Sequence, residues 1–139
     1  MPTYVLDSSA ALRYIDDEAG AARVEELLDD CASWRADLCI SAVQWGEIAV
    51  KLRKRLGPVE QMRVLSSFLP SEAQIVPATA ERAVRAAGLK VDRGIAYADG
   101  FALDLVMEGA DRVLVTADYG FKAADDLAQI EFLPAKQAK

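Results

Sequence analysis

Residues 4–10 (YVLDSSA) decide the predicted fold, because a short apolar strand leads directly to a carboxylate and then to hydroxyl residues that open a helix. A similar order returns at residues 113–121 (VLVTADYGF), where an apolar strand is followed by Thr116 and Asp118. Between these stretches, strand-like apolar segments alternate with helical ones. This alternation predicts an α/β fold whose mostly parallel sheet is covered by helices on both faces.

The pattern places five short strands along the chain, at residues 4–6, 36–40, 73–76, 112–115 and 130–133. Helices are expected over residues 10–14, 20–30, 41–56, 59–68, 79–88, 95–109 and 119–127. Ser41 followed three residues later by Gln44 matches a capping box at a helix start. Gly57-Pro58 predicts that this helix stops there.

The composition bounds both the size of the protein and its chemistry. The chain has 139 residues, of which 53% are hydrophobic, which suits one domain over residues 1–139 with a proper core. It contains no His, which excludes a Ser-His-Asp triad, a His general base and a His-containing zinc site. Cys31 and Cys39 are too few for a four-thiolate site, and we expect two buried thiols.

The net charge of −6, from 16 Lys and Arg against 22 Asp and Glu, argues against a protein that coats DNA nonspecifically. It leaves nucleic acid open as a substrate, since a metal-dependent nuclease carries a carboxylate cluster of its own. The sequence shows neither a signal-peptide pattern nor an apolar run of membrane-spanning length. We therefore expect a cytoplasmic protein that does not enter a membrane.

Two of the acidic residues come at or just after the ends of predicted strands: Asp7 directly follows residues 4–6, and Asp118 follows residues 112–115 through Thr116 and Ala117. Asp7 and Asp118 should lie at the carboxyl edge of the sheet, where α/β folds bind their ligands. Capping of the next helix explains each of them equally well. The pattern alone leaves both explanations open.

Asp99 and Asp104 fall on different sides of the helix expected over residues 95–109. A helical wheel groups Asp99 with Ala102, Leu103 and Val106, so its carboxylate needs a metal ion, a cationic partner or an arginine in the core. The same wheel places Asp104 on the solvent side, together with Tyr97, Gly100 and Glu108. We therefore expect Asp104 to be an ordinary surface residue.

Glu47 is the weakest candidate by pattern. Lys51 follows one turn later, in the favourable orientation of an exposed ion pair, and the pattern alone favours that surface pair. The position of Glu47 near the start of a helix that follows a strand nevertheless brings it toward the sheet edge of Asp7 and Asp118. Four convergent carboxylates without His suit Mg²⁺ or Mn²⁺, and such an ion could activate water for phosphodiester hydrolysis.

These residues resemble the PIN-domain ribonucleases, in particular the toxin of VapBC toxin–antitoxin pairs. The stretches that match are residues 5–10 (VLDSSA), the Glu47 helix after Ile40-Ser41, residues 97–103 (YADGFAL) and residues 114–121 (LVTADYGF). Any one of these motifs is weak, but the four occur in the order of the family and span nearly the whole chain.

The resemblance implies a three-layer α/β/α fold, Mg²⁺- or Mn²⁺-dependent cleavage of RNA, a homodimer, and inhibition by a VapB-type antitoxin. By motif position, the catalytic residues would be Asp7, Glu47, Asp99 and Asp118. The metal would be held by Asp7, Asp99 and Asp118. Thr116 would orient the last acid or a bound water, with Ser8 as a further supporting hydroxyl.

A basic run lies on the Glu47 helix and consists of Lys51, Arg53, Lys54 and Arg55. It is either a solvated helix face that offsets the helix dipole or a surface that contacts RNA phosphates or an acidic antitoxin segment. Other Asp-based phosphotransfer folds are disfavoured, because Val76-Pro77 offers no acceptor Asp and Ser9 stands where a second Asp would be needed. The alternative function is a catalytically silent PIN-like scaffold that binds RNA or a partner.

Overall fold

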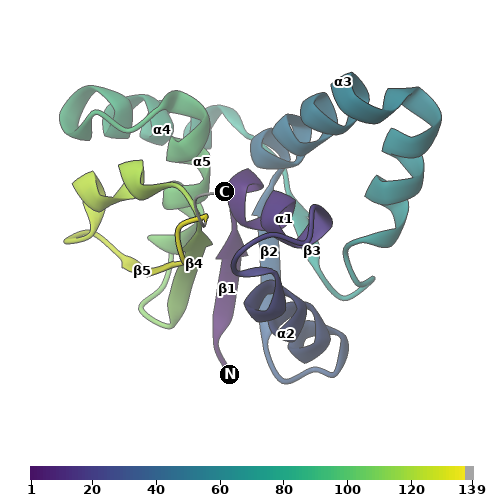
Figure 1. Cartoon of the computed structure of the whole chain (residues 1–139). Coiled ribbons are helices and arrows are strands. Elements are labelled where there is room, and N and C mark those ends of the chain that lie inside the picture. Colours follow the sequence, from purple (N-terminus) through teal and green to yellow (C-terminus); the bar gives the residue numbers. More distant parts are fainter. Residues whose placement is uncertain (137–139) are drawn as a thin grey trace.

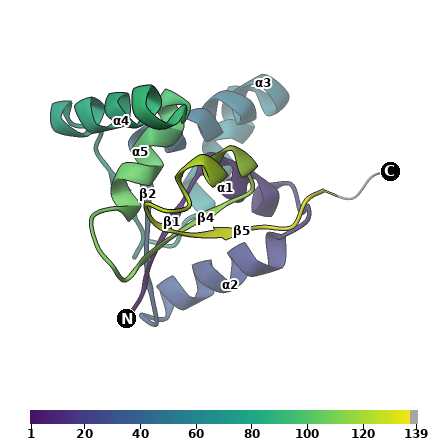
Figure 2. The same ribbon diagram turned by 90° about the vertical axis from the view of Figure 1, so that its left-hand side faces the viewer.

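The computed structural model describes residues 1–136 and contains one sheet of five strands in the order β3-β2-β1-β4-β5. Every neighbouring pair of strands is parallel (Figures 1 and 2). The strands are β1 (Thr3–Leu6), β2 (Asp37–Ser41), β3 (Gln74–Val76), β4 (Arg112–Thr116) and β5 (Gln129–Phe132). The predicted parallel five-stranded sheet is confirmed.

Helices cover both faces of this sheet. They are α1 (Ser8–Ile15), α2 (Ala21–Ala32), α3 (Ala42–Ser67), α4 (Ala80–Arg93), α5 (Tyr97–Val106) and the short 3-10 helix η1 (Tyr119–Ala124). Figure 2 shows α2 on one side of the strands and α4 with α5 on the other. The fold is the three-layer α/β/α arrangement that the sequence predicted.

The core explains why the strands are apolar throughout rather than alternating. Successive side chains of a strand point to opposite faces, so Val5 packs in the cluster that contains Leu103 of α5, while Leu6 packs in the cluster that contains Leu27 of α2. Both faces are therefore buried, as in other parallel sheets. A third cluster joins α1 to α3 through residues such as Leu12.

Most predicted element boundaries hold, with two informative details. Gly57 has φ 81° and ψ 174° inside α3, so the helix axis breaks at the predicted Gly57-Pro58 step. By contrast, α4 does not end near Gly88 but continues to Arg93, where Gly94 caps it in the left-handed conformation. Cys31 and Cys39 are buried free thiols, as expected. Within residues 1–136, no helix is both long and apolar enough to cross a membrane.

The prediction that Asp104 faces solvent is wrong. Its carboxylate is only 4% exposed, because α4 packs over the side of α5 that the helical wheel had assigned to water. Oδ1 of Asp104 accepts from Nε of Arg85 at 2.5 Å, and Oδ2 accepts from Nη1 of Arg82 at 2.9 Å. Gly100 is likewise buried, with its α-carbon facing the backbone of Ala86 in α4. Asp104 is thus a buried anchor between α4 and α5.

The strand register brings two chain segments together at the carboxyl edge of the sheet. Leu6 of β1 pairs with Val115 of β4, and the N–H of Asp7 donates to the carbonyl of Val115 at 3.4 Å. The residues that follow these two central strands are therefore neighbours, although more than a hundred positions separate them in the sequence.

Candidate active site

Asp7 is the buried centre of the carboxylate cluster, with only 1% of its surface exposed. Its Oδ1 accepts from the N–H of Ala10 at 2.9 Å and thereby caps the N-terminus of α1. Its Oδ2 accepts from the hydroxyl of Thr116 at 2.6 Å. Asp7 therefore caps α1 and also lies at the carboxyl edge of the sheet, as predicted, while its role in binding a ligand stays a prediction.

Two hydroxyl side chains hold Asp7 in place and link it to the segment after β4. Thr116 donates to Asp7 and accepts from the N–H of Asp118 at 2.9 Å. Ser9 donates to Asp7 at 2.8 Å and accepts from the N–H of Ala117 at 2.9 Å. The supporting hydroxyl predicted at Ser8 is therefore found at Ser9.

Gln44 is a site residue that the sequence analysis missed. Its side chain is fully buried, and its Oε1 accepts from the N–H of Ser8 at 2.7 Å. Its Nε2 donates to the carbonyl of Ala98 at 2.7 Å and to Oδ1 of Asp99 at 3.4 Å. One amide thus joins the starts of α1, α3 and α5, the helices next to three of the four candidate acids.

The capping-box prediction is therefore only half correct. Ser41 does cap α3 by accepting from the N–H of Val43 at 3.1 Å, but Gln44 turns away from the cap toward α1 and α5. A sequence signal for this role existed. Gln44, Ile48 and Leu52 occupy one apolar stripe at i, i+4 and i+8, and all three are buried.

The other three acids surround Asp7 from different elements. Asp99 lies in the first turn of α5 and is half-buried. Asp118 is exposed, and its Oδ1 caps η1 by accepting from the N–H of Gly120 at 2.8 Å. Glu47 is half-buried on α3, and in the described part of the chain it forms no ion pair with Lys51. The surface pair that the pattern of Glu47 favoured is absent there.

Burial and the neighbouring acids together raise the pKa values of Asp7 and Asp99. Burial raises the pKa of Asp7 to about 6, and the charge of Asp118 adds to the rise, while hydrogen bonds from Thr116, Ala10 and Ser9 oppose it. Burial also raises the pKa of Asp99 to about 7, followed by the charges of Asp118, Asp7 and Glu47, against a hydrogen bond from Gln44. The structure therefore gathers the four predicted acids into one electrostatic cluster.

This cluster is not a closed metal cage. In residues 1–136, no three Asp, Glu or Cys side chains are close enough together to form a ready-made metal site. Both oxygens of Asp7 already accept hydrogen bonds. Mg²⁺, however, keeps several waters and commonly needs only one or two carboxylates. Uncompensated carboxylates with raised pKa values therefore fit a hydrated, hard divalent cation and do not fit a cation stripped of its water.

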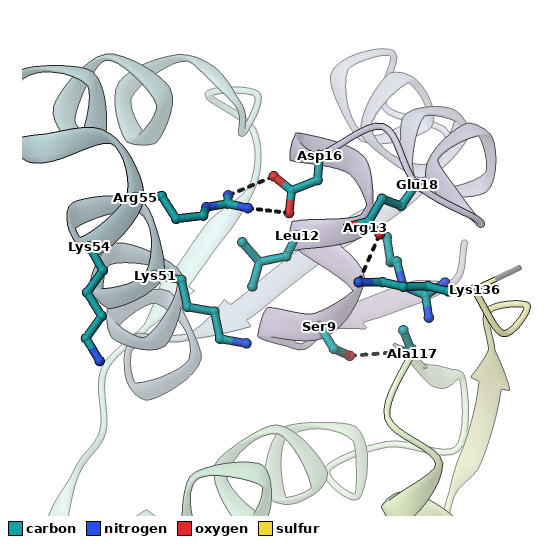
Figure 3. A pocket seen from close by; sticks show the side chains of 10 residues that line it. All are labelled: Ser9, Leu12, Arg13, Asp16, Glu18, Lys51, Lys54, Arg55, Ala117 and Lys136. Carbon is teal, nitrogen blue, oxygen red and sulfur yellow. Dashed lines mark hydrogen bonds and ion pairs between the residues drawn. The ribbon is translucent and has the colours of Figure 1, made fainter. Parts of the chain in front are cut away.

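A basic pocket of about 470 Å³ lies beside the acids, between α1 and α3 (Figure 3). Three of the four cations in the predicted basic run line it, namely Lys51, Lys54 and Arg55. Arg53 does not line it, and instead lies 3.5 Å from the side-chain oxygen of Gln61. Ser9 belongs to both the pocket and the acid cluster.

The PIN domain family model matches residues 4–127 of the sequence. This chain belongs to the PIN-domain family. The matched range includes all four acids and Gln44. No curated protein matches the sequence.

Solved structures share the fold of this PIN domain at low sequence identity. The VapBC2 structure from Rickettsia felis, bound to a DNA fragment from its promoter, is 18% identical with a TM-score of 0.71 and covers 95% of this chain and 99% of that chain. Mycobacterium tuberculosis VapC20, described as a Sarcin-Ricin loop cleaving toxin, is 18% identical with a TM-score of 0.66 and covers 87% and 94%. VapBC-5 from the same organism is 17% identical with a TM-score of 0.60 and covers 97% and 100%. The PIN domain therefore has the architecture of VapC toxins.

Proposed function

We propose that this PIN domain is a Mg²⁺- or Mn²⁺-dependent endoribonuclease, the toxin of a VapBC-type toxin–antitoxin pair. The observation that carries the proposal is geometric: Asp7 is buried at the carboxyl edge of the sheet, and Thr116 links its carboxylate to the backbone N–H of Asp118. Gln44 joins the same edge to Asp99, through the N–H of Ser8 and the carboxylate of Asp99. Burial and neighbouring carboxylates raise the pKa of both Asp7 and Asp99. Negative charge confined at the carboxyl edge of a sheet is costly unless a cation neutralises it. The scissile phosphodiester would need that same cation in order to react at the cluster.

The roles of the four acids follow from their positions. We assign metal binding to Asp7, Asp99 and Asp118, which lie on three different segments and act on one another electrostatically. A divalent ion bound there would polarise the phosphoryl oxygen and lower the pKa of an attacking water. Glu47, the half-buried fourth acid, would orient that water and accept its proton.

The remaining residues of the site would keep these carboxylates in position. Thr116 and Ser9 fix both oxygens of Asp7, and the amide of Gln44 holds Asp99 against α1. Such fixed positions reduce the reorganisation needed when charge develops on the phosphate. Ser8 would support the site through its backbone N–H, which donates to Oε1 of Gln44.

The partners of the proposed toxin follow from the same assignment. The structural relatives include a VapBC complex on promoter DNA and a toxin that cleaves the Sarcin-Ricin loop. For this chain we propose an RNA substrate, a cognate VapB-type antitoxin, a homodimeric state and a cytoplasmic location. The basic run would contact RNA or the antitoxin, mainly through Lys51, Lys54 and Arg55.

The test is cleavage of a mixed pool of cellular RNA by the purified protein, with Mg²⁺, with Mn²⁺ and with EDTA. We expect cleavage that requires the metal and that falls at least about 100-fold in Asp99→Asn and in Asp7→Asn. Asp29→Asn is the matched control, because Asp29 is exposed on α2, and it should cleave normally. Asp104→Asn is unsuitable as a control because that carboxylate is buried.

The alternative is a silent scaffold that binds RNA or a partner without cutting it. That scaffold would tolerate the loss of its carboxylates. Metal-independent cleavage, or equal growth arrest by the wild type and by both variants on expression, would contradict the proposed mechanism. Circular dichroism spectra of the variants would establish that the fold is retained.

A further inference from the structure

We propose that the basic pocket between α1 and α3 is a subsite for a backbone phosphate of the RNA strand, with Arg13 and Lys51 as its two phosphate-binding cations. The inference rests on the proposed nuclease function and extends it to a second phosphate, next to the one that is cut. Arg13 belongs to none of the motifs that identify the family. Its assignment depends on burial, charge and position alone.

Arg13 is a buried cation without a carboxylate partner. Only 8% of its surface is exposed, and its Nη1 donates to the carbonyls of Ala19 and Pro134, each at 2.7 Å. No carboxylate in residues 1–136 lies within 4 Å of it, so two neutral carbonyls, and no acidic partner, hold its guanidinium. Burying an uncompensated charge is unfavourable, and an anion in the pocket would relieve the cost.

The guanidinium retains donors for such an anion. A guanidinium has five N–H groups, and the bonds of Arg13 to the carbonyls of Ala19 and Pro134 use only Nη1. In the described residues, Nε and Nη2 of Arg13 form no hydrogen bond with the protein, and the Arg13 side chain lines the pocket. A planar guanidinium fixed in this way is suited to the oxygens of a phosphate.

The pocket as a whole is positive, although the protein is acidic. Its lining contains five cations against two acids, and these residues are Arg13, Lys51, Lys54, Arg55, Lys136, Asp16 and Glu18. Both acids are already neutralised, because Asp16 pairs with Arg55 at 2.7 Å and Glu18 pairs with Lys136 at 2.9 Å. The unpaired positive charge of the pocket therefore belongs to Arg13, Lys51 and Lys54.

Lys51 supplies the second phosphate-binding cation from the opposite wall. Figure 3 shows its side chain reaching from α3 toward Ser9 and Leu12, whereas Lys54 points away from α1. No carboxylate in the described residues lies within 4 Å of Lys51. A phosphate in the pocket would thus meet a fixed cation on α1 and a flexible one on α3.

The pocket continues directly from the acid cluster. Ser9 and Ala117 line the pocket, and the N–H of Ala117 donates to the Ser9 hydroxyl that holds Asp7. An RNA strand whose scissile phosphate lies over the acids can therefore place a neighbouring phosphate between α1 and α3. Contacts to phosphate set the register of a strand and do not select its sequence.

The direct test measures binding of a fluorescein-labelled oligouridylate of twelve nucleotides in EDTA, so that the strand is bound and not cut. The dissociation constant is followed by fluorescence anisotropy over a range of salt concentrations. In Lys51→Gln we expect binding about tenfold weaker at low salt and a slope of log K against log salt that is smaller by about 0.7, as for one lost phosphate contact on a single strand. Lys51→Arg should retain the slope.

Lys90→Gln is the matched control, since Lys90 is an exposed residue of α4 outside the pocket, and its slope should equal that of the wild type. Arg13→Gln should weaken binding and reduce the salt slope as Lys51→Gln does. It also loses the hydrogen bonds from α1 to the carbonyls of Ala19 and Pro134. Lys51 is exposed, so its variant isolates the phosphate contact from folding. In the cleavage assay, Lys51→Gln should raise KM and leave kcat nearly unchanged.

The outcomes separate this inference from the proposed function. If Lys51→Gln binds and cuts RNA as the wild type does, with an unchanged salt slope, the phosphate subsite is overturned and the proposed nuclease function stands. The absence of both RNA binding and RNA cleavage in the wild type overturns both proposals. An oligoglutamate peptide that binds in a Lys51-dependent manner, while oligouridylate does not, would assign the pocket to an acidic peptide and overturn its assignment to RNA.

Discussion

Replacing Asp7 with Asn should change the stability of the metal-free protein in a direction that depends on pH. The pKa of Asp7 is about 6 in the folded chain, against an ordinary value of 3.8. A raised carboxyl pKa favours folding while the group is protonated, and that contribution is lost as the pH rises from about 4 through about 6. At pH 8 the ionised carboxylate therefore costs about 3 kcal/mol of stability.

The substitution also removes hydrogen bonds. The amide of Asn can still accept from the N–H of Ala10, but it cannot accept from both the Thr116 and Ser9 hydroxyls, at a cost of about 1–2 kcal/mol. We therefore expect Asp7→Asn to be more stable than the wild type by about 1–2 kcal/mol at pH 8. At pH 4 the electrostatic gain is only about 0.5 kcal/mol, so the variant should be the less stable protein.

The measurement is urea denaturation in EDTA at pH 8 and at pH 4, followed by circular dichroism. The difference between variant and wild type should change by about 2.5 kcal/mol between the two pH values. Asp29→Asn should differ from the wild type by less than about 0.5 kcal/mol at both pH values. An equal loss of stability in Asp7→Asn at both pH values would show that the folded carboxyl titrates ordinarily, and the electrostatic argument would fail.

Two further substitutions test the contacts that surround the site. Gln44→Met should lower the free energy of unfolding by about 2 kcal/mol, because it leaves the N–H of Ser8 without its partner; an unchanged urea midpoint would contradict this role. Asp104→Asn should lower the free energy of unfolding by about 2 kcal/mol, because Arg82 loses a buried partner and keeps only Glu108. Thermal unfolding measures this loss, and a melting temperature equal to that of the wild type would refute the prediction.

The fold was predictable because its signals are local. Each strand is a short apolar run, and each of the first four strands is followed by a helix whose first residue is capped, so alternation alone predicts a parallel sheet. The positions of Asp7 and Asp118 were predictable for the same reason. Asp7 directly follows β1, and Asp118 lies two residues after β4, the strand that pairs with β1. The break at Gly57 was also local, because a Gly-Pro step ends a helix wherever it occurs.

The errors arise where distant segments meet. A helical wheel assumes one solvent-facing side, but α5 is covered by the sheet on one side and by α4 on the other, which buries Asp104. Gln44 was assigned to its own helix cap because its actual partners, Ser8 and Ala98, are far away in sequence. Similarly, the burial of Arg13 could not be predicted from the sequence, because it depends on Pro134 near the end of the described chain.

The central claim is that four carboxylates from separate segments form one site for a hydrated divalent cation. Thermal unfolding of the protein with and without saturating Mn²⁺ tests this claim most directly. A ligand at a hundred times its Kd stabilises the folded state by about 2.7 kcal/mol, which for a chain of this size raises Tm by about 8 °C. We predict such a rise for the wild type and for Asp29→Asn, and little or none for Asp99→Asn. An identical Tm for the wild type with and without Mn²⁺ would contradict the claim.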